Sequence, residues 1–237
     1  MFKRAVILAG GQGKRLKPYT VVLPKPLVPI DQYPILEIVI RQLVKHGFTH
    51  ITMAVNHMAE IIKAFFGDGS RWKVKIDYSM EDKPLSTMGP LKLIGNLPEN
   101  FLVMNGDILT TLNYAEFYDF HCNQNSVFTI AATQRVHEME YGVLEVDEFS
   151  RLSGFNEKPS VKYNVSMGIY MANRSILEHI PLNTPYGFDN LMYDFLKYKK
   201  TVNILPFDGL WFDIGRPDDY FQAAEAFSGI KNEILGE

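Results

Sequence analysis

Short apolar runs alternate with amphipathic segments along the first half of the chain. The apolar runs are rich in Val, Ile and Phe, as β-strands are, and the segments between them place apolar residues at helical spacing. The predicted strands are Arg4–Ala9, His50–Val55, Val74–Tyr78, Phe101–Met104 and Val127–Ala132. The predicted helices are Pro34–His46, Met58–Phe66, Thr87–Leu93 and Tyr114–His121. This alternation indicates an α/β fold in which helices cover both faces of a mostly parallel sheet.

The second half of the chain has strands with tighter connections. The predicted strands are Gly142–Val146, Leu152–Glu157, Ser166–Met171 and Val202–Pro206. The predicted helices are Arg174–His179, Gly187–Tyr198 and Pro217–Ala226. Because no Ser/Gly-rich linker separates the halves, we predict one domain over residues 1–237, with halves at about 1–135 and 136–237. We expect the second half to cover the open edge of the first.

Composition and charge narrow the class of protein. The chain has 237 residues, of which 46% are hydrophobic and 22% charged, as in an ordinary globular domain. A net charge of −3 without a polybasic run argues against nucleic acid or an acidic membrane as the main partner. The single Cys122 excludes an internal disulfide, and the apolar run Ala5–Ala9 is far too short for a signal peptide or a membrane span. We therefore expect a cytoplasmic protein.

A glycine-rich segment follows the first predicted strand. Ligands of parallel sheets bind at the carboxyl ends of the strands, where Gly10, Gly11 and Gly13 fall. Glycines let backbone amides approach phosphate oxygens closely, and Arg15 and Lys25 add positive charge beside them. The segment is neither a P-loop nor a good dinucleotide fingerprint. Glycines alone are equally compatible with a tight turn, but the added cations favour a polyphosphate site.

Two carboxylates occupy similar places at the ends of apolar runs. Asp107 follows the predicted strand Phe101–Met104, and Asp213 ends the run Trp211–Phe212. A lone aspartate at a strand end is more often a turn residue or a helix cap. A pair of them is suited to Mg²⁺, which prefers oxygen ligands together with substrate phosphates.

Several motifs resemble those of the sugar-1-phosphate nucleotidylyltransferase family, in particular its short mannose-1-phosphate and heptose-1-phosphate guanylyltransferase-like members. Residues 10–20, GGQGKRLKPYT, resemble the family's G-G-x-G-T-R-L-x-P-x-T, with Lys14 in place of Thr. Residues 24–29, PKPLVP, match P-K-P-L-x-P, and residues 211–215, WFDIG, resemble W-x-D-x-G. The resemblance implies a Rossmann-like three-layer fold and the reaction of an NTP with a sugar 1-phosphate to give an NDP-sugar and pyrophosphate. It also implies that Asp107 and Asp213 share one Mg²⁺.

The resemblance also assigns roles to individual residues. Arg15, Lys25 and Asp107 would be catalytic. The nucleotide-binding residues would be Leu8, Ala9, Gly10, Gly11, Gly13, Glu81, Ser86 and Gly106. The sugar-phosphate-binding residues would be Gly142, Glu157, Lys158 and Ser166. The Glu157-Lys158-Pro159 motif matches the family's E-K-P, although without the other motifs an exposed salt bridge before a turn would be the simpler interpretation. Ser166 stands where Asn is common, and Ser86 where Gly is common.

The nucleobase is predicted from Glu81, which stands where the family often has Gln. A carboxylate accepts hydrogen bonds only, so it suits the adjacent N1–H and N2–H₂ donors of guanine better than the carbonyls of uracil. This favours GTP with a mannose- or heptose-type sugar 1-phosphate. In the alternative, Glu81 points to solvent and backbone groups bind the base.

Three other functions stay open: an enzyme that uses UTP, dTTP or CTP, a cytidylyltransferase for a polyol or amino-alcohol phosphate, and a silent regulatory subunit that binds sugar nucleotides. We expect small-molecule partners, no nucleic acid, no membrane and no room for the left-handed β-helix of some relatives. A homodimer is compatible with the sequence.

Overall fold

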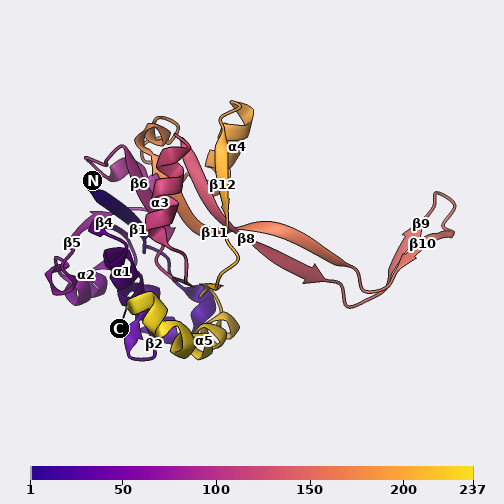
Figure 1. Ribbon diagram of the computed structural model, residues 1–237, viewed down its shortest axis with the longest axis horizontal. Helices are drawn as coiled ribbons and strands as arrows, with labels where there is room; N and C mark the ends of the chain where they lie inside the picture. The colour runs from indigo at the N-terminus through magenta and orange to yellow at the C-terminus, as the bar shows by residue number, and fades with distance from the viewer. Residues whose placement is uncertain (1, 237) are drawn as a thin grey trace.

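The computed structural model describes residues 2–236 and is built around a seven-stranded mixed sheet. Its strand order is β12-β8-β11-β6-β1-β4-β5 (Figure 1). Four strands of the first half are parallel neighbours: β1 (Lys3–Leu8), β4 (Phe48–Val55), β5 (Lys75–Met80) and β6 (Asn100–Asn105). The second half adds β8 (Phe128–Glu138), β11 (Ser160–Asn173) and β12 (Val202–Pro206). Only β11 runs antiparallel to its neighbours, which confirms the mostly parallel sheet.

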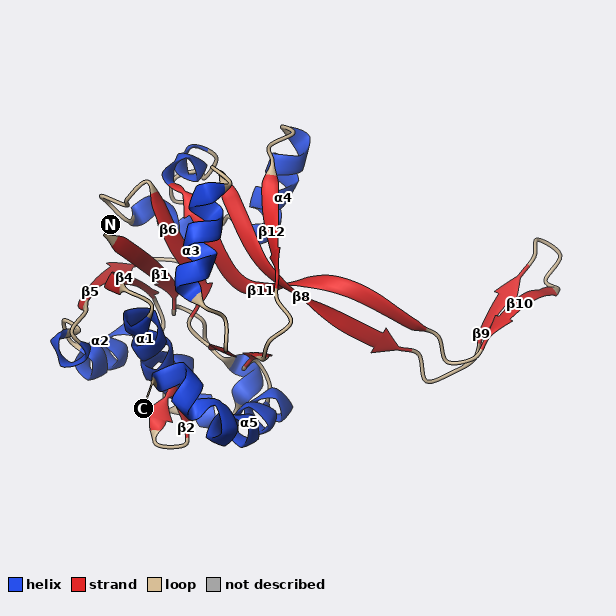
Figure 2. Cartoon of the chain, viewed as in Figure 1, coloured by secondary structure: helices blue, strands red, loops and turns tan. Residues whose placement is uncertain are grey.

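Both faces of the sheet are buried beneath helices, as Figure 2 shows. One face packs on α1 (Ile35–Lys45), α2 (Ala59–Phe66) and α3 (Tyr114–Asn123). The other packs on α4 (Phe188–Lys197) and two 3₁₀ helices, Gly89–Leu93 and Arg174–Glu178. Side chains alternate between these two cores along β6, where Leu102 and Met104 join the first, and Phe101 and Val103 the second. The expected three-layer α/β architecture is therefore confirmed.

A third apolar cluster anchors the C-terminal helix α5 (Pro217–Leu235) against α1. Near it lies a short ladder of β2 (Pro29–Ile30) and β3 (Tyr33–Pro34). The sequence prediction ended this last helix at Ala226, which is wrong by more than two turns. The reason is packing: Ala223, Phe227, Ile230 and Ile234 continue the helical spacing into the cluster. Within residues 2–236, no helix combines the length and apolar character needed to cross a bilayer.

Two segments predicted as α-helices are shorter and form 3₁₀ helices. The prediction Thr87–Leu93 becomes Gly89–Leu93, and Arg174–His179 becomes Arg174–Glu178. In the first, Gly89 and Pro90 occupy the opening positions, and neither sustains a longer helix. The tight 3₁₀ turn buries Pro90 and Leu91 against the sheet instead.

A long β-arm, residues 136–163, projects from the body (Figures 1 and 2). It continues β8 and β11 beyond the sheet and ends in a hairpin of β9 (Val143–Val146) and β10 (Leu152–Asn156). The sequence predicted β8 to end at Ala132 and β11 to begin at Ser166, so both strands are longer than expected. The extensions were missed because both faces of this ribbon are exposed, so no alternation of buried and polar residues marks them.

Candidate active site

A cleft of about 480 Å³ opens at the carboxyl ends of β1, β4 and β6. Eleven of the predicted residues line it: Leu8, Ala9, Gly10, Gly11, Gly13, Arg15, Lys25, Glu81, Ser86, Gly106 and Asp107. A larger cavity of about 690 Å³, beside Arg4 and Asp77, contains none of the predicted residues. Chemistry rather than size therefore identifies the smaller cleft as the candidate active site.

The floor of the cleft is backbone brought close by glycines. The amide of Gly106 donates to the carbonyl of Leu8 at 3.0 Å, which joins β6 to β1 at the base of the cleft. A Cβ on Gly106 would lie 3.1 Å from Ile7 Cγ2, tighter than nearly all real contacts of this kind. Gly13 adopts the left-handed region (φ +61°), and its carbonyl accepts from Thr20 Oγ1 at 2.8 Å. These constraints keep the loop amides near the cleft, where a phosphate could approach them.

Lys25 is the most strongly perturbed cation of the cleft. It begins a short 3₁₀ helix, Lys25–Leu27, whose Pro26 and Leu27 are buried, and its ammonium forms an ion pair with Asp107. The pKa of Lys25 is lowered to about 8, mainly by burial and in part by the neighbouring Arg15, while Asp213 and Asp219 oppose the fall. A lysine of this kind is close to losing its proton in neutral to mildly basic solution.

Asp107 and Asp213 are brought together by a two-stranded ladder. The strands β7 (Ile108–Thr110) and β13 (Trp211–Asp213) pair antiparallel, with Asp213 opposite Ile108. The amide of Ile214 donates to the carbonyl of Asp107 at 3.0 Å, so the backbone segments that carry the two aspartates lie side by side. The segment also meets Arg15, because a Cβ on Gly215 would lie 3.2 Å from Arg15 Nη2.

The donor set fits a magnesium ion better than a transition metal. In residues 2–236, no three His, Cys, Asp or Glu side chains gather where they could hold a metal. Magnesium in phosphate-transfer sites uses one or two carboxylates and takes its other ligands from substrate phosphates and water. The carboxylate of Asp107 faces the ammonium of Lys25 inside the cleft, so it already has one positive partner. The metal itself stays a prediction.

Glu81 lines the cleft directly beside the glycine-rich loop, next to Gly10. Its Oε2 accepts from the amide of Leu85 at 2.9 Å, and its Oε1 would lie 3.2 Å from a Cβ on Gly10. Burial raises the pKa of Glu81, and the Leu85 amide partly opposes this. The carboxylate therefore faces into the cleft, not out to solvent. Ser86 adopts a left-handed φ of +65°, a conformation that serine adopts at some cost.

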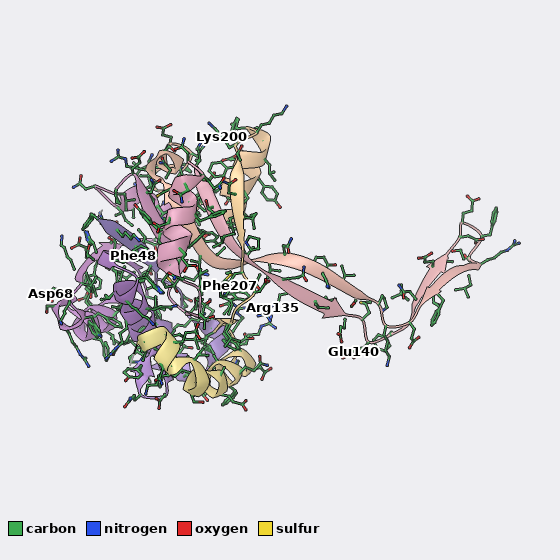
Figure 3. The ribbon with its side chains drawn as sticks, viewed as in Figure 1. Phe48, Asp68, Arg135, Glu140, Lys200 and Phe207 are labelled. Carbon is green, nitrogen blue, oxygen red and sulfur yellow. The ribbon has the colours of Figure 1, made fainter. Side chains whose placement is uncertain are left out.

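The predicted sugar-phosphate residues do not line this cleft. Gly142, Glu157 and Lys158 lie on the β-arm, where Gly142 opposes Phe155 and Glu157 across the ribbon. Figure 3 shows how far the arm departs: Arg135 lies at its base and Glu140 well out along it. Ser166 lies at the root of the arm, where its hydroxyl contacts Tyr170 OH at 3.2 Å. The role of these four residues stays a prediction, and within one copy of the chain three of them stand clear of the cleft.

Sequence reasoning assigned no role to Asn56 and Asn105, which line the cleft, or to Arg135, which contacts the segment that carries Asp213. Asn56 and Asn105 line the cleft directly after β4 and at the end of β6, positions that the strand-end rule could have identified. The guanidinium of Arg135 packs 4.9 Å from the centre of the Trp211 ring, two residues before Asp213. This contact joins β8 to β13, which are distant in the sequence, so only the three-dimensional structure reveals it.

Comparison with known proteins agrees with this geometry. Residues 4–228 match the family model described as "Nucleotidyl transferase". The chain is 33% identical over 244 residues to a UTP–glucose-1-phosphate uridylyltransferase of Synechocystis, covering 93% of this chain and 62% of that protein. It is 33% identical over 226 residues to a mannose-1-phosphate guanyltransferase of Hypocrea jecorina, covering 92% of this chain and 62% of that one. The chain thus spans about 62% of the length of these relatives.

Comparison with solved structures finds a similar protein whose full length is covered by this chain. The crystal structure of HddC from Yersinia pseudotuberculosis superimposes with a TM-score of 0.75 at 28% identity, covering 95% of this chain and 100% of that one. A second structure of HddC, complexed with GMP-PN, superimposes with a TM-score of 0.72.

Proposed function

Because the chain belongs to the nucleotidyl transferase family, we propose that it joins a nucleoside triphosphate to a sugar 1-phosphate and releases pyrophosphate. The observation that carries the proposal is the clustering of Arg15, Lys25, Asp107 and the glycine-rich backbone in one cleft at the strand ends. Such a cleft offers amide donors and cations to a triphosphate, and a pair of carboxylates to a metal. Since an NTP is an intracellular substrate, we place the protein in the cytoplasm.

In the proposed reaction, a phosphate oxygen of the sugar 1-phosphate forms a bond to the α-phosphorus of the NTP. The bond from that phosphorus to the α–β bridging oxygen breaks, and its electron pair leaves with pyrophosphate. No covalent enzyme intermediate is needed, so the protein contributes position and charge. The amides of residues 10–13 and the guanidinium of Arg15 hold the β- and γ-phosphates, and Lys25 moves from Asp107 to the α-phosphate.

Asp107 and Asp213 would hold Mg²⁺ on the α-phosphate side of the cleft. The bound ion would neutralise phosphate charge and so reduce repulsion between the two reacting anions. The pairing of β7 with β13 supports this role, because it places Asp213 opposite Ile108, the residue that follows Asp107.

GTP is the nucleotide that we propose. Glu81 supports it, since Oε1 faces the cleft across Gly10 and Oε2 keeps one lone pair beyond the bond from Leu85. The structural similarity to HddC, which was crystallised with GMP-PN, supports the same choice. A mannose- or heptose-type sugar 1-phosphate is the acceptor proposed with it. The relative from Synechocystis is named for UTP, so UTP is the nucleotide that any assay must include.

The test is pyrophosphate release from four NTPs, each with several sugar 1-phosphates and Mg²⁺. We expect turnover with GTP to exceed that with UTP, CTP and dTTP, and Arg15→Ala to reduce turnover with every substrate. Lys158→Ala should instead raise KM for the sugar phosphate alone. Binding of an NDP-sugar without pyrophosphate formation in either direction would identify a silent regulatory subunit and overturn the proposal.

A further inference from the structure

The β-arm carries Glu157 and Lys158 away from the cleft of its own chain. Its strands stay in continuous register from Ser166 opposite Ala132 to Ser160 opposite Glu138. Ser160 lies six strand positions beyond Ser166, which corresponds to roughly 20 Å at about 3.3 Å a residue. Lys158 lies beyond that point. To reach its own cleft, the arm would have to break this ladder.

The arm is an apolar surface without a partner. No residue from 136 to 163 is buried. Of the 25 exposed large apolar side chains in residues 2–236, ten belong to the arm: Val136, Met139, Tyr141, Leu144, Val146, Phe149, Leu152, Phe155, Val161 and Tyr163. Soluble proteins do not usually gather apolar side chains this way unless something covers them.

At the tip of the arm, the hairpin of β9 and β10 gathers four exposed apolar side chains on one face. Leu144 lies opposite Phe155, and Val146 opposite Leu152, and directly opposed residues share a face of the ribbon. These four side chains, the tip face, are 58–67% exposed. A lone two-stranded hairpin is marginally stable in water, so this face needs a surface to pack on.

The area available is sufficient for a stable dimer. If each of the ten arm side chains exposes roughly 100 Å², one arm offers roughly 1,000 Å². Burying half of that on both arms, with an equal area of the surfaces they cover, gives roughly 2,000 Å² in total, which is within the range of stable interfaces.

The complementary surface flanks the cleft. Residues 14–23, the basic rim, expose Lys14, Arg15 and Lys17, followed by the apolar side chains Tyr19, Val21, Val22 and Leu23. No acidic residue occurs between Met1 and Ile30. The arm, in contrast, has six acidic and three basic side chains. An acidic apolar arm and a basic apolar rim are matched in both charge and polarity.

We propose that the arm of each chain docks on the basic rim of a second copy, so that each cleft is completed by Glu157 and Lys158 of the other copy. The inference rests on the proposed function, in which a second anion must be held beside the triphosphate. The cleft's own Lys25 is paired with Asp107, and Lys14 and Arg15 line the cleft next to the glycine-rich loop that is proposed to bind the triphosphate. Lys158, from the second copy, supplies the cation for the sugar phosphate, and Glu157 accepts from sugar hydroxyls.

Mixing two defective variants tests whether the site is shared. Arg15→Ala damages the cleft and Lys158→Ala the arm, and both side chains are exposed, so neither change should prevent folding. After subunit exchange at equal amounts, half of the dimers contain both variants, and each of these has one intact site of two. We expect about a quarter of wild-type activity. Activity no greater than the mean of the separate variants would overturn the proposal.

The matched control places both substitutions on one chain and mixes it with wild type. In a shared-site dimer, every mixed dimer is then inactive, so activity falls to about a quarter of that of wild type alone at the same total protein concentration. If each chain completes its own site, activity falls only to a half. An active wild-type protein that is monomeric by light scattering at the assay concentration would also overturn the proposal.

Docking is tested separately from activity, so that a failure of the proposed function is recognisable. In a Cys122→Ser background, one tagged copy carries Val22→Cys and a differently tagged copy carries Leu144→Cys. We expect a disulfide-linked species with both tags after mild oxidation. We expect no such species when the rim cysteine Val22→Cys is replaced by Leu196→Cys, an exposed position on α4 outside the rim. Failure of the two tagged copies to crosslink would show that the tip face does not meet the rim, whether or not the enzyme is active.

Discussion

The perturbed Lys25 makes a prediction about stability and pH. Burial is the largest cause of its low pKa, and the neighbouring Arg15 adds to it. The fall from 10.5 to about 8 corresponds to roughly 3 kcal/mol, since each tenfold change in a proton equilibrium is about 1.4 kcal/mol. This is the free energy by which the folded protein disfavours the charged lysine relative to the unfolded chain.

The sign follows from proton counts in the two states. Below about pH 8, Lys25 is charged in both states and the full penalty opposes folding. Between about pH 8 and 10.5, the unfolded chain holds the proton and the folded protein has released it. Stability then rises with pH, by up to about 1.4 kcal/mol per pH unit for this group. Lys25 therefore contributes a gain in the free energy of unfolding between pH 7 and pH 10.

Urea unfolding of the wild type and Lys25→Met at pH 7 and pH 10 measures this gain. We expect the pH-dependent change in unfolding free energy to differ between the two proteins by about 2–3 kcal/mol, because all other titrating groups cancel in the comparison. Lys14→Met, which removes an exposed lysine of the neighbouring loop, should behave like the wild type. Equal pH dependence in the wild type and Lys25→Met would refute the assigned burial of this charge.

Three further predictions concern the cleft and its edge. Asp107→Asn and Asp213→Asn should each lower turnover at saturating Mg²⁺ by a hundredfold or more, and near-normal turnover would remove them as metal ligands. Asp107→Asn should also lower the thermal midpoint, because it removes the partner of Lys25, whereas Asp213→Asn should shift the midpoint little. Glu81→Gln should reduce the preference for GTP over UTP in competition assays by about ten- to hundredfold, and an unchanged ratio would mean that other groups select the base. Gly168→Ala should destabilise the fold by roughly 1–3 kcal/mol, because φ is +72° and a Cβ would lie 2.6 Å from Asn105 Nδ2. Gly229→Ala, in open space on α5, is its control and should not destabilise in chemical unfolding.

The body of the fold could be predicted from sequence because its strands are buried on both faces. Strand β12 was predicted at its observed bounds, and β4 and α1 to within about two residues. A continuous apolar run such as Phe101–Met104 is stable only when both of its faces are buried, and these four residues are buried in the structure. The residues at the ends of such strands then fall at one edge of the sheet, which is why the cleft contains so many of the predicted residues.

The arm could not be predicted in the same way. Its residues alternate between two exposed faces, so no pattern of burial distinguishes a long ribbon from two short strands joined by a loop. A motif such as Glu157-Lys158-Pro159 indicates which ligand its side chains suit, but it does not predict where those side chains lie relative to the cleft. Its distance from the cleft depends on the register of β8 and β11, and on the bulge between Ser166 and Tyr170 that bends β11 past Asn105. Both are properties of pairing between distant segments.

The proposed nucleotide-binding residues and the proposed sugar-phosphate-binding residues consequently lie on parts of the structure that differ in burial. The groups proposed to bind the nucleotide lie on loops that leave buried strands, so changes near Gly106 or Gly13 meet neighbouring atoms within about 3 Å. The groups proposed to bind the sugar phosphate lie on an exposed ribbon, where substitution disturbs no core. Sequence change along the arm is therefore free to alter the acceptor without loss of fold stability, provided the tip face keeps its apolar character. The nucleotide, in contrast, is bound where the fold tolerates little change.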